Sequence, residues 1–65
     1  MNYVLKKGKY YLSDYELAFN NEKVTLLKCE IGIEYQRLFS SFETAEAIRK
    51  LILDKIGIDF TVKKF

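Results

Sequence analysis

The stretch Tyr3–Leu12, "YVLKKGKYYL", has two apolar runs on either side of a single glycine, and this arrangement predicts a β-hairpin. Two turns compete for its centre, one with Lys7 and Gly8 as the loop residues and one with Gly8 and Lys9. The first turn sets Lys6 opposite Lys9, which is a like-charge pair, and forces Lys7 to a positive φ. We therefore predict a type II′ turn whose two central residues are Gly8 and Lys9.

This register sorts the side chains of the hairpin onto two faces. Leu5 and Leu12 point toward the core, whereas Tyr11 and Tyr15 lie on a wetter face with Lys6 between them. Rings beside cations are typical of proteins that hold single-stranded nucleic acid, but tyrosine is also common in strands because it packs well there. Acidic residues follow in the sequence and disfavour a phosphate backbone, so we interpret these rings as structural side chains of a hairpin.

A second hairpin is predicted from "ELAFNNEKVTLLKCEI", Glu16–Ile31. Asn20 and Asn21 tolerate left-handed backbone and begin a polar loop of about four residues. Strand alternation gives the segment after this loop two faces. One face carries Thr25, Leu27, Cys29 and Ile31, and the other carries Val24, Leu26, Lys28 and Glu30. Cys29 is therefore predicted to be a buried structural thiol.

The clearest element is the helix predicted from "SSFETAEAIRKLILDKIG", Ser40–Gly57. Ser40 or Ser41 can cap its first turn, and Ser40 with Glu43 has the capping-box spacing. Gly57 is expected to end the helix as a left-handed cap. Apolar residues recur at helical spacing along one face, and they are Phe42, Ala45, Ile48, Leu51, Ile52 and Ile56.

The remaining segments predict one or two further strands. Gly32 interrupts the second hairpin, and Ile33–Phe39 then resumes a rough alternation that predicts a bend and a short strand. Ile58–Phe65, "IDFTVKKF", alternates as a half-buried strand. This last strand runs either parallel to the Ile33–Phe39 strand, after a right-handed crossover, or antiparallel to the first strand at the edge of the sheet.

Together these elements predict a single small α+β domain over residues 1–65, with an antiparallel sheet of about four strands and one helix on one face, in the order β-β-β-(β)-α-β.

The net charge is +2, and its distribution is uneven. Residues 1–13 carry three lysines and no acid, whereas residues 14–48 carry seven acids and three bases. If the two terminal segments lie side by side, one positive patch forms from Lys6, Lys7, Lys9, Lys63 and Lys64.

Several chemistries are disfavoured by composition. The chain has no histidine and one cysteine, Cys29, which disfavours a catalytic triad and a thiolate or imidazole zinc site. Gly8, Gly32 and Gly57 are isolated, so no glycine-rich phosphate loop is present. We expect no enzymatic activity, no cofactor and no metal. The single cysteine and the lack of a long apolar run or signal sequence lead us to expect a cytoplasmic protein.

One helix covers only one side of a sheet, and the other side is expected to expose more apolar surface than a small monomer usually does. The residues concerned are Tyr11, Tyr15, Val24, Leu26 and Leu38. Leu53 also lies off the main apolar stripe of the predicted helix. We therefore predict a protein-binding module that forms a homodimer or homo-oligomer and contacts its partner through Tyr11, Tyr15, Leu26 and Leu53.

Two segments, "YVLKKGKYYLSDYE" and "RLFSSFETAEAIRKL", resemble the layout of small proteins encoded by phages and prophages of Gram-positive bacteria. In those proteins a hairpin rich in lysine and tyrosine precedes an aromatic, serine-capped helix and a last strand. The resemblance implies a protein of the bacterial cytoplasm that modulates or inhibits a host or defence protein by occluding one of its surfaces. It implies no particular functional residue.

Two alternative functions come from the basic and aromatic residues. The first is a single-stranded nucleic-acid binder, whose affinity would fall steeply with salt. Its contact residues would be Lys6, Lys9, Tyr11, Lys63 and Lys64. The second is a sponge that sequesters a small nucleotide between subunits.

Overall fold

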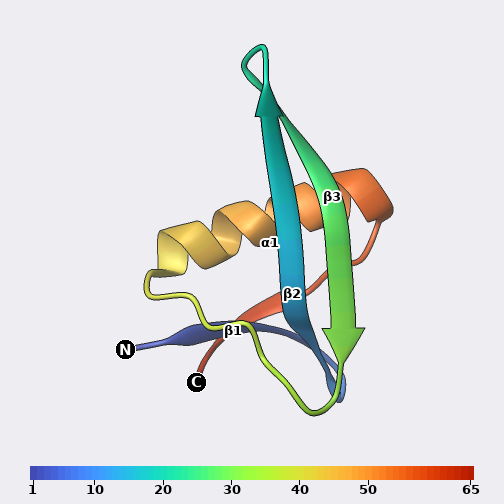
Figure 1. Ribbon diagram of the computed structural model, residues 1–65. Helices are drawn as coiled ribbons and strands as arrows, with labels where there is room; N and C mark the ends of the chain where they lie inside the picture. Colours follow the sequence, from blue (N-terminus) through green and yellow to red (C-terminus); the bar gives the residue numbers. More distant parts are fainter.

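Four strands and one helix make up the fold, and the computed structural model describes all residues 1–65 (Figure 1). The elements are β1 (Tyr3–Lys7), β2 (Tyr10–Asn20), β3 (Lys23–Gly32), α1 (Phe42–Ile56) and β4 (Thr61–Lys64). The strands form one antiparallel sheet in the order β3-β2-β1-β4, so that β3 and β4 are its two edges. The predicted fold class, an α+β arrangement with one helix against an antiparallel sheet, is confirmed.

The turn between β1 and β2 is the one that the sequence favours. Lys7 pairs with Tyr10, so Gly8 and Lys9 are the two loop residues. Gly8 has a φ of 61°, which the first central position of a type II′ turn requires and which side chains other than hydrogen disfavour. The prediction for this turn is confirmed.

The turn between β2 and β3 is shorter than predicted. Asn20 pairs with Lys23, which leaves Asn21 and Glu22 as a two-residue loop. Both loop residues have positive φ, 50° at Asn21 and 65° at Glu22. Two positive φ values are the requirement of a type I′ turn, whose twist matches that of the flanking strands. The twist of the long hairpin therefore imposes a left-handed conformation on a glutamate, a residue type for which it is unfavourable.

β1 and β2 separate soon after their turn, and β1 runs across the foot of the β2–β3 hairpin (Figure 1). The chain between β3 and α1 enters this gap. The N–H of Arg37 donates to the Leu12 carbonyl at 2.8 Å, and Tyr3 and Phe39 exchange two backbone hydrogen bonds of 2.8 and 2.9 Å. The predicted strand over Ile33–Phe39 is wrong, because the segment forms only one isolated bridge. Its other role is to hydrogen-bond to backbone groups of β1 and β2 that no longer pair with each other.

β4 pairs with β1 in antiparallel fashion at the edge of the sheet, with Leu5 opposite Val62. The alternative pairing with Ile33–Phe39 is wrong because that segment offers no strand to pair with. Phe60, just before β4, is only 2% exposed, and Val62 packs against the same core. The predicted alternation of a half-buried strand therefore holds, although the hydrogen-bonded part is limited to Thr61–Lys64.

α1 begins and ends at residues that the sequence marks. Ser41 is the N-cap, and its Oγ accepts from the Thr44 N–H at 3.1 Å, so the choice between Ser40 and Ser41 is settled. Gly57 is the C-cap with a φ of 76°, and its N–H donates to the Leu53 carbonyl at 3.0 Å. The helix buries the centre of its apolar stripe in a core that consists of Leu5, Leu12, Phe39, Ala45, Ile48, Ile52 and Phe60.

A β-bulge near the start of β2 changes the side of the sheet that its later side chains occupy. Leu12 lies opposite Ile31 and Asp14 lies opposite Glu30, so Ser13 is an extra residue on β2. Because successive side chains in a strand alternate between faces, one extra residue moves every later side chain to the other face.

A second bulge does the same in β3. Leu17 lies opposite Leu26 and Glu16 lies opposite Lys28, so Leu27 is the extra residue, and its side chain is 61% exposed. Together the two bulges bring the apolar residues of both strands onto the side of α1. They are Leu12, Tyr15, Leu17, Phe19, Val24, Leu26, Cys29 and Ile31. The predicted placement of Tyr15 and Leu26 on the solvent face is therefore wrong.

Candidate functional site

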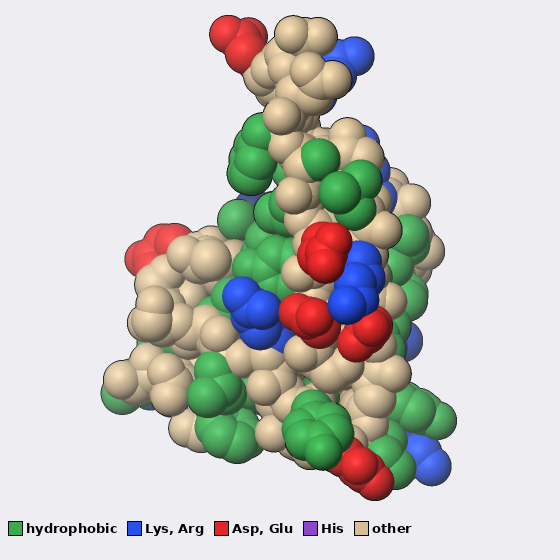
Figure 2. Space-filling model, viewed as in Figure 1, with side chains coloured by type: hydrophobic (Ala, Val, Ile, Leu, Met, Phe, Trp, Pro, Cys, Tyr) green, Lys and Arg blue, Asp and Glu red, His purple; other side chains and the backbone are tan.

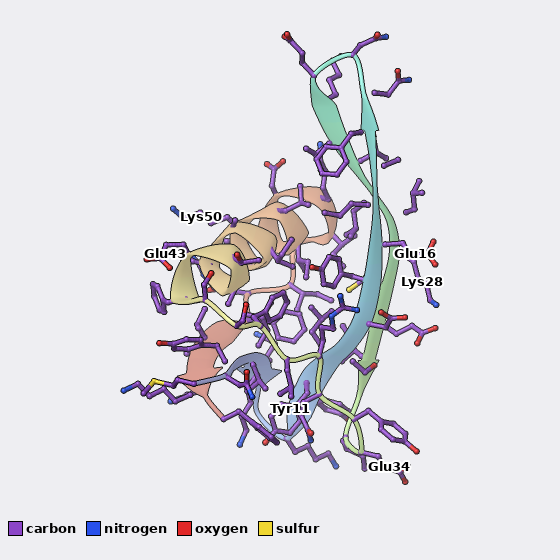
Figure 3. All side chains as sticks on the ribbon, turned by 60° about the vertical axis from the view of Figure 1, so that its left-hand side comes forward. Tyr11, Glu16, Lys28, Glu34, Glu43 and Lys50 are labelled. Atoms are coloured by element: carbon purple, nitrogen blue, oxygen red, sulfur yellow. The ribbon has the colours of Figure 1, made fainter.

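The middle of the outer face of the β2–β3 hairpin, on the side away from α1, carries a cluster of acidic and basic side chains (Figures 2 and 3). Lys28 Nζ lies 3.4 Å from Asp14 Oδ2 and 3.2 Å from Glu30 Oε1. Its hydrogen bond to Glu30 is the main reason that the pKa of Lys28 is raised. Glu16 points outward beside this cluster (Figure 3). The predicted apolar surplus on this face is wrong for Tyr15, Val24 and Leu26, which lie on the side of α1, whereas Tyr11 does lie on the outer face.

Asp14 also binds the backbone where β1 leaves β2. Its Oδ1 accepts from the Tyr15 N–H at 2.9 Å and lies 3.2 Å from the Arg37 guanidinium. The backbone hydrogen bond, followed by the nearby cations Lys28 and Arg37, lowers the pKa of Asp14. This carboxylate therefore supplies an acceptor for a strand N–H that β1 no longer serves.

Tyr15 is a packing residue and does not project into solvent. Its ring stacks on the Phe39 ring with centroids 5.8 Å apart and an interplanar angle of 18°. The Arg37 guanidinium carbon lies 4.9 Å from the centroid of the Tyr15 ring. With these two groups against it and the core beside it, Tyr15 has little surface to offer a partner.

The four predicted contact residues do not form one surface. Leu26 packs against the core on the α1 side, as Tyr15 does. Tyr11 lies near the foot of the hairpin (Figure 3), and Lys6 Nζ lies 5.3 Å from its ring centroid. Leu53 is 39% exposed on the helix. No common docking surface is therefore made by these residues.

A different apolar site lies between the upper part of the hairpin and α1, and we name it the overhang groove. It has a volume of about 300 Å³. Its walls are Leu17, Phe19 and Val24 from the hairpin and Ala47, Ile48 and Leu51 from the helix. Every lining residue is apolar, so this groove provides neither acid–base groups nor ligands for a metal ion.

The overhang groove exists because α1 crosses the hairpin below its tip (Figure 1). The apolar pair Phe19 and Val24 lies next to the tip, beyond the part of the ribbon that the helix covers. The Phe19 side chain is 76% exposed, the highest value of any aromatic residue in the protein. An aromatic ring exposed to this degree beside an apolar hollow is the usual composition of a protein-binding site.

Sequence reasoning included Val24 in an apolar surplus but missed Phe19. The signal was present, since Tyr15, Leu17 and Phe19 alternate in one phase and Leu12 lies in the other. A change of phase within one strand is what a bulge at Ser13 produces. An alternation without a bulge assigns these apolar residues to the opposite face of the sheet.

The predicted basic patch is divided between two faces, although β1 and β4 do lie side by side. Lys6 and Lys63 share the outer face with Tyr11, as the pairs Lys6–Tyr11 and Val4–Lys63 require. Lys64 lies opposite Tyr3, which packs toward the core side, and Lys9 lies in the turn. Strand alternation therefore prevents the five lysines from merging into one patch.

Cys29 is partly buried against the core, and desolvation raises the pKa of its thiol, which makes the thiolate less available. No group of three or more histidine, cysteine, aspartate or glutamate side chains is placed to hold a metal ion.

Comparisons with known proteins add no relative, because no protein-family model, no curated protein and no solved structure matches this chain. The single helix, α1, is not long and apolar enough to cross a membrane.

Proposed function

We propose that this protein is a non-enzymatic protein-binding module and that the overhang groove is its docking surface. The observation that carries this proposal is the 76% exposure of Phe19 at the rim of a groove with entirely apolar walls. Exposed aromatic residues next to apolar hollows are the residues that contribute most to binding in protein interfaces. In line with the phage resemblance, the partner would be a bacterial host or defence protein in the cytoplasm, whose surface the module occludes.

The chemistry of the groove favours a protein partner over a nucleic acid or a polar metabolite. Its lining has no donor, acceptor or charge to recognise phosphate, sugar or base edges. Glu22 and Lys23, at the hairpin tip, place charge at one end of the groove, whereas Lys50 points from the helix away from the hairpin (Figure 3). An apolar contact area with charged residues at its edge is common in protein interfaces.

The same groove would support self-association, because it contains both a projecting ring and a hollow. A two-fold symmetric contact uses one patch on both copies, so this patch must be complementary to itself. Phe19 of one copy would occupy the hollow beside Ala47 of the other, and the homodimer would be in equilibrium with partner-bound monomer.

A matched pair of variants tests the docking surface. Phe19→Ser removes the exposed ring of the groove, and Tyr35→Ser removes a ring of similar exposure, 73%, outside it. Capture of binding proteins from a lysate of Gram-positive bacteria is expected to be lost with Phe19→Ser and retained with Tyr35→Ser. Equal capture by both variants contradicts the proposal. Light scattering of the two purified variants reports self-association.

A second candidate function, binding of single-stranded nucleic acid, is favoured by one observation. The pairing of β1 with β4 puts Lys6 and Lys63 on the same face as Tyr11, and neither lysine forms an ion pair. This candidate expects a gel shift at about 50 mM salt that disappears by about 200 mM salt. It also expects the shift to be lost in Lys6→Glu, and the absence of any shift at low salt contradicts it.

A further inference from the structure

A second hollow lies at the foot of the hairpin, at the opposite end of the ribbon from the overhang groove, and we name it the turn pocket. Its volume is about 280 Å³. It is lined by Lys7, Tyr10, Ile31, Ile58 and Phe60. Phe60 is only 2% exposed and forms the floor, whereas Ile31 is 39% exposed and forms part of a wall. The turn pocket therefore has an apolar interior that is accessible from solvent.

Two lysines without carboxylate partners lie next to this pocket, whose own lining surface is entirely apolar. Lys7 lines it directly, and Lys9 Nζ lies 5.6 Å from the ring centroid of Tyr10. Neither lysine forms an ion pair in the structure. Tyr10 adds a phenol hydroxyl, which can donate a hydrogen bond to an anion.

The acidic residues adjacent in sequence to the pocket lining are bound elsewhere. Glu30, next to Ile31, lies 3.2 Å from Lys28 on the outer face of the hairpin. Asp59, between two lining residues, lies 3.3 Å from the Arg49 guanidinium. Each of these cations also binds a second carboxylate, Asp14 for Lys28 and Glu46 for Arg49, so both acids are held in ion pairs while Lys7 and Lys9 are not.

We propose that the turn pocket binds a small amphipathic carboxylate, with its apolar tail on Phe60 and its carboxylate at Lys7 and Tyr10. The volume lies just below the usual range of ligand pockets, about 300 to 1,000 Å³, so a short acyl chain or a single ring fits and a long acyl chain does not. The apolar floor disfavours a bare inorganic anion, and the lysines disfavour a cationic ligand. This site is independent of the overhang groove and does not rest on the docking function.

Octanoate, below the concentration at which it forms micelles, is a suitable probe. In a titration followed by amide chemical shifts, it should move the resonances of Ile31, Ile58 and Phe60 and leave that of Phe19 unchanged. Octanol has the same tail without the charge and should bind about tenfold more weakly or worse. Shifts centred on Phe19, or equal affinity for octanol, would overturn the proposal.

Two lysine variants test the role of charge at the mouth. Lys7→Glu should weaken octanoate binding about tenfold or more. Lys64→Glu is the control, because it changes the net charge by the same amount on a strand that does not line the pocket. This variant should bind octanoate like the wild type. Lys7→Gln, which removes the charge without adding a repulsive one, should lie between them. Equal binding by wild type, Lys7→Glu and Lys7→Gln rejects the assignment, and so does the absence of any octanoate-induced shift in the wild type.

Discussion

The N–H of Arg37 donates to the carbonyl oxygen of Leu12 at 2.8 Å, and a loop thereby takes the place beside β2 that β1 has left. This substitution allows β1 and β4 to turn away and form the base of the core while the β2–β3 hairpin continues past α1 (Figure 1). The hairpin is thus long enough to overhang the helix. The candidate docking surface is therefore a consequence of how the sheet divides.

The carboxylate of Asp14 should make stability depend on acidity. Its pKa is lowered in the folded protein, chiefly by the Tyr15 N–H, from an ordinary value of 3.8. Because the folded-state pKa is lowered, the ionised carboxylate stabilises the folded protein above pH 3.8. This stabilisation is lost as the pH falls through the folded-state pKa. The difference in urea midpoint between wild type and Asp14→Asn should accordingly shrink below pH 3.8.

Glu34 provides the control for this titration, because it is exposed and forms no ion pair or side-chain hydrogen bond. Glu34→Gln should follow the wild-type profile between pH 7 and the acid limit. If the urea midpoints of wild type and Asp14→Asn differ by the same amount at every pH, the loss of charge at Asp14 has no part in acid unfolding.

Tyr15 should contribute to stability through its packing. Tyr15→Ala removes a ring that stacks on Phe39 and supports Arg37, so we expect a loss of roughly 2 kcal/mol, less than the 3 to 5 kcal/mol typical of fully buried aromatic residues. Tyr35→Ala, at a site where the ring is 73% exposed, should change the free energy of unfolding by about 0.5 kcal/mol or less. Similar denaturation midpoints for the two variants would mean that Tyr15 is the surface residue that unbroken alternation predicts.

The elements that depend on local sequence patterns were predictable from the sequence, whereas the β-bulges that interrupt the strands were not. Gly8 and Gly57 signal their turn and cap by conformational requirements that few other residues meet. Ser13 and Leu27, by contrast, have side chains that fit an ordinary strand as well as a bulge. Only the pairing of the two strands reveals them, and every later side chain changes face as a result. The error in the predicted contact surface follows directly.

The start of α1 offers a direct comparison of two adjacent serines. Ser41 caps the helix through the Thr44 N–H, whereas the Ser40 side chain forms no hydrogen bond. Ser41→Ala should therefore lower the free energy of unfolding by about 1 kcal/mol, while Ser40→Ala should leave it almost unchanged. Equilibrium urea denaturation measures both. A larger loss at Ser40 would indicate that the capping box predicted with Glu43 is the true cap.

The hairpin tip should be easy to stabilise. Glu22 has a φ of 65°, a conformation that costs a residue with a Cβ roughly 1 to 2 kcal/mol, whereas glycine adopts it freely. Part of this gain is offset by the greater entropy of glycine in the unfolded chain, so Glu22→Gly should stabilise by about 0.5 to 1 kcal/mol. In a domain of this size that corresponds to a rise in thermal midpoint of roughly 2 to 8 °C. Glu22→Ala, which removes the charge and keeps the Cβ, should give no such rise, and an equal gain in both variants would assign the effect to charge rather than to backbone strain.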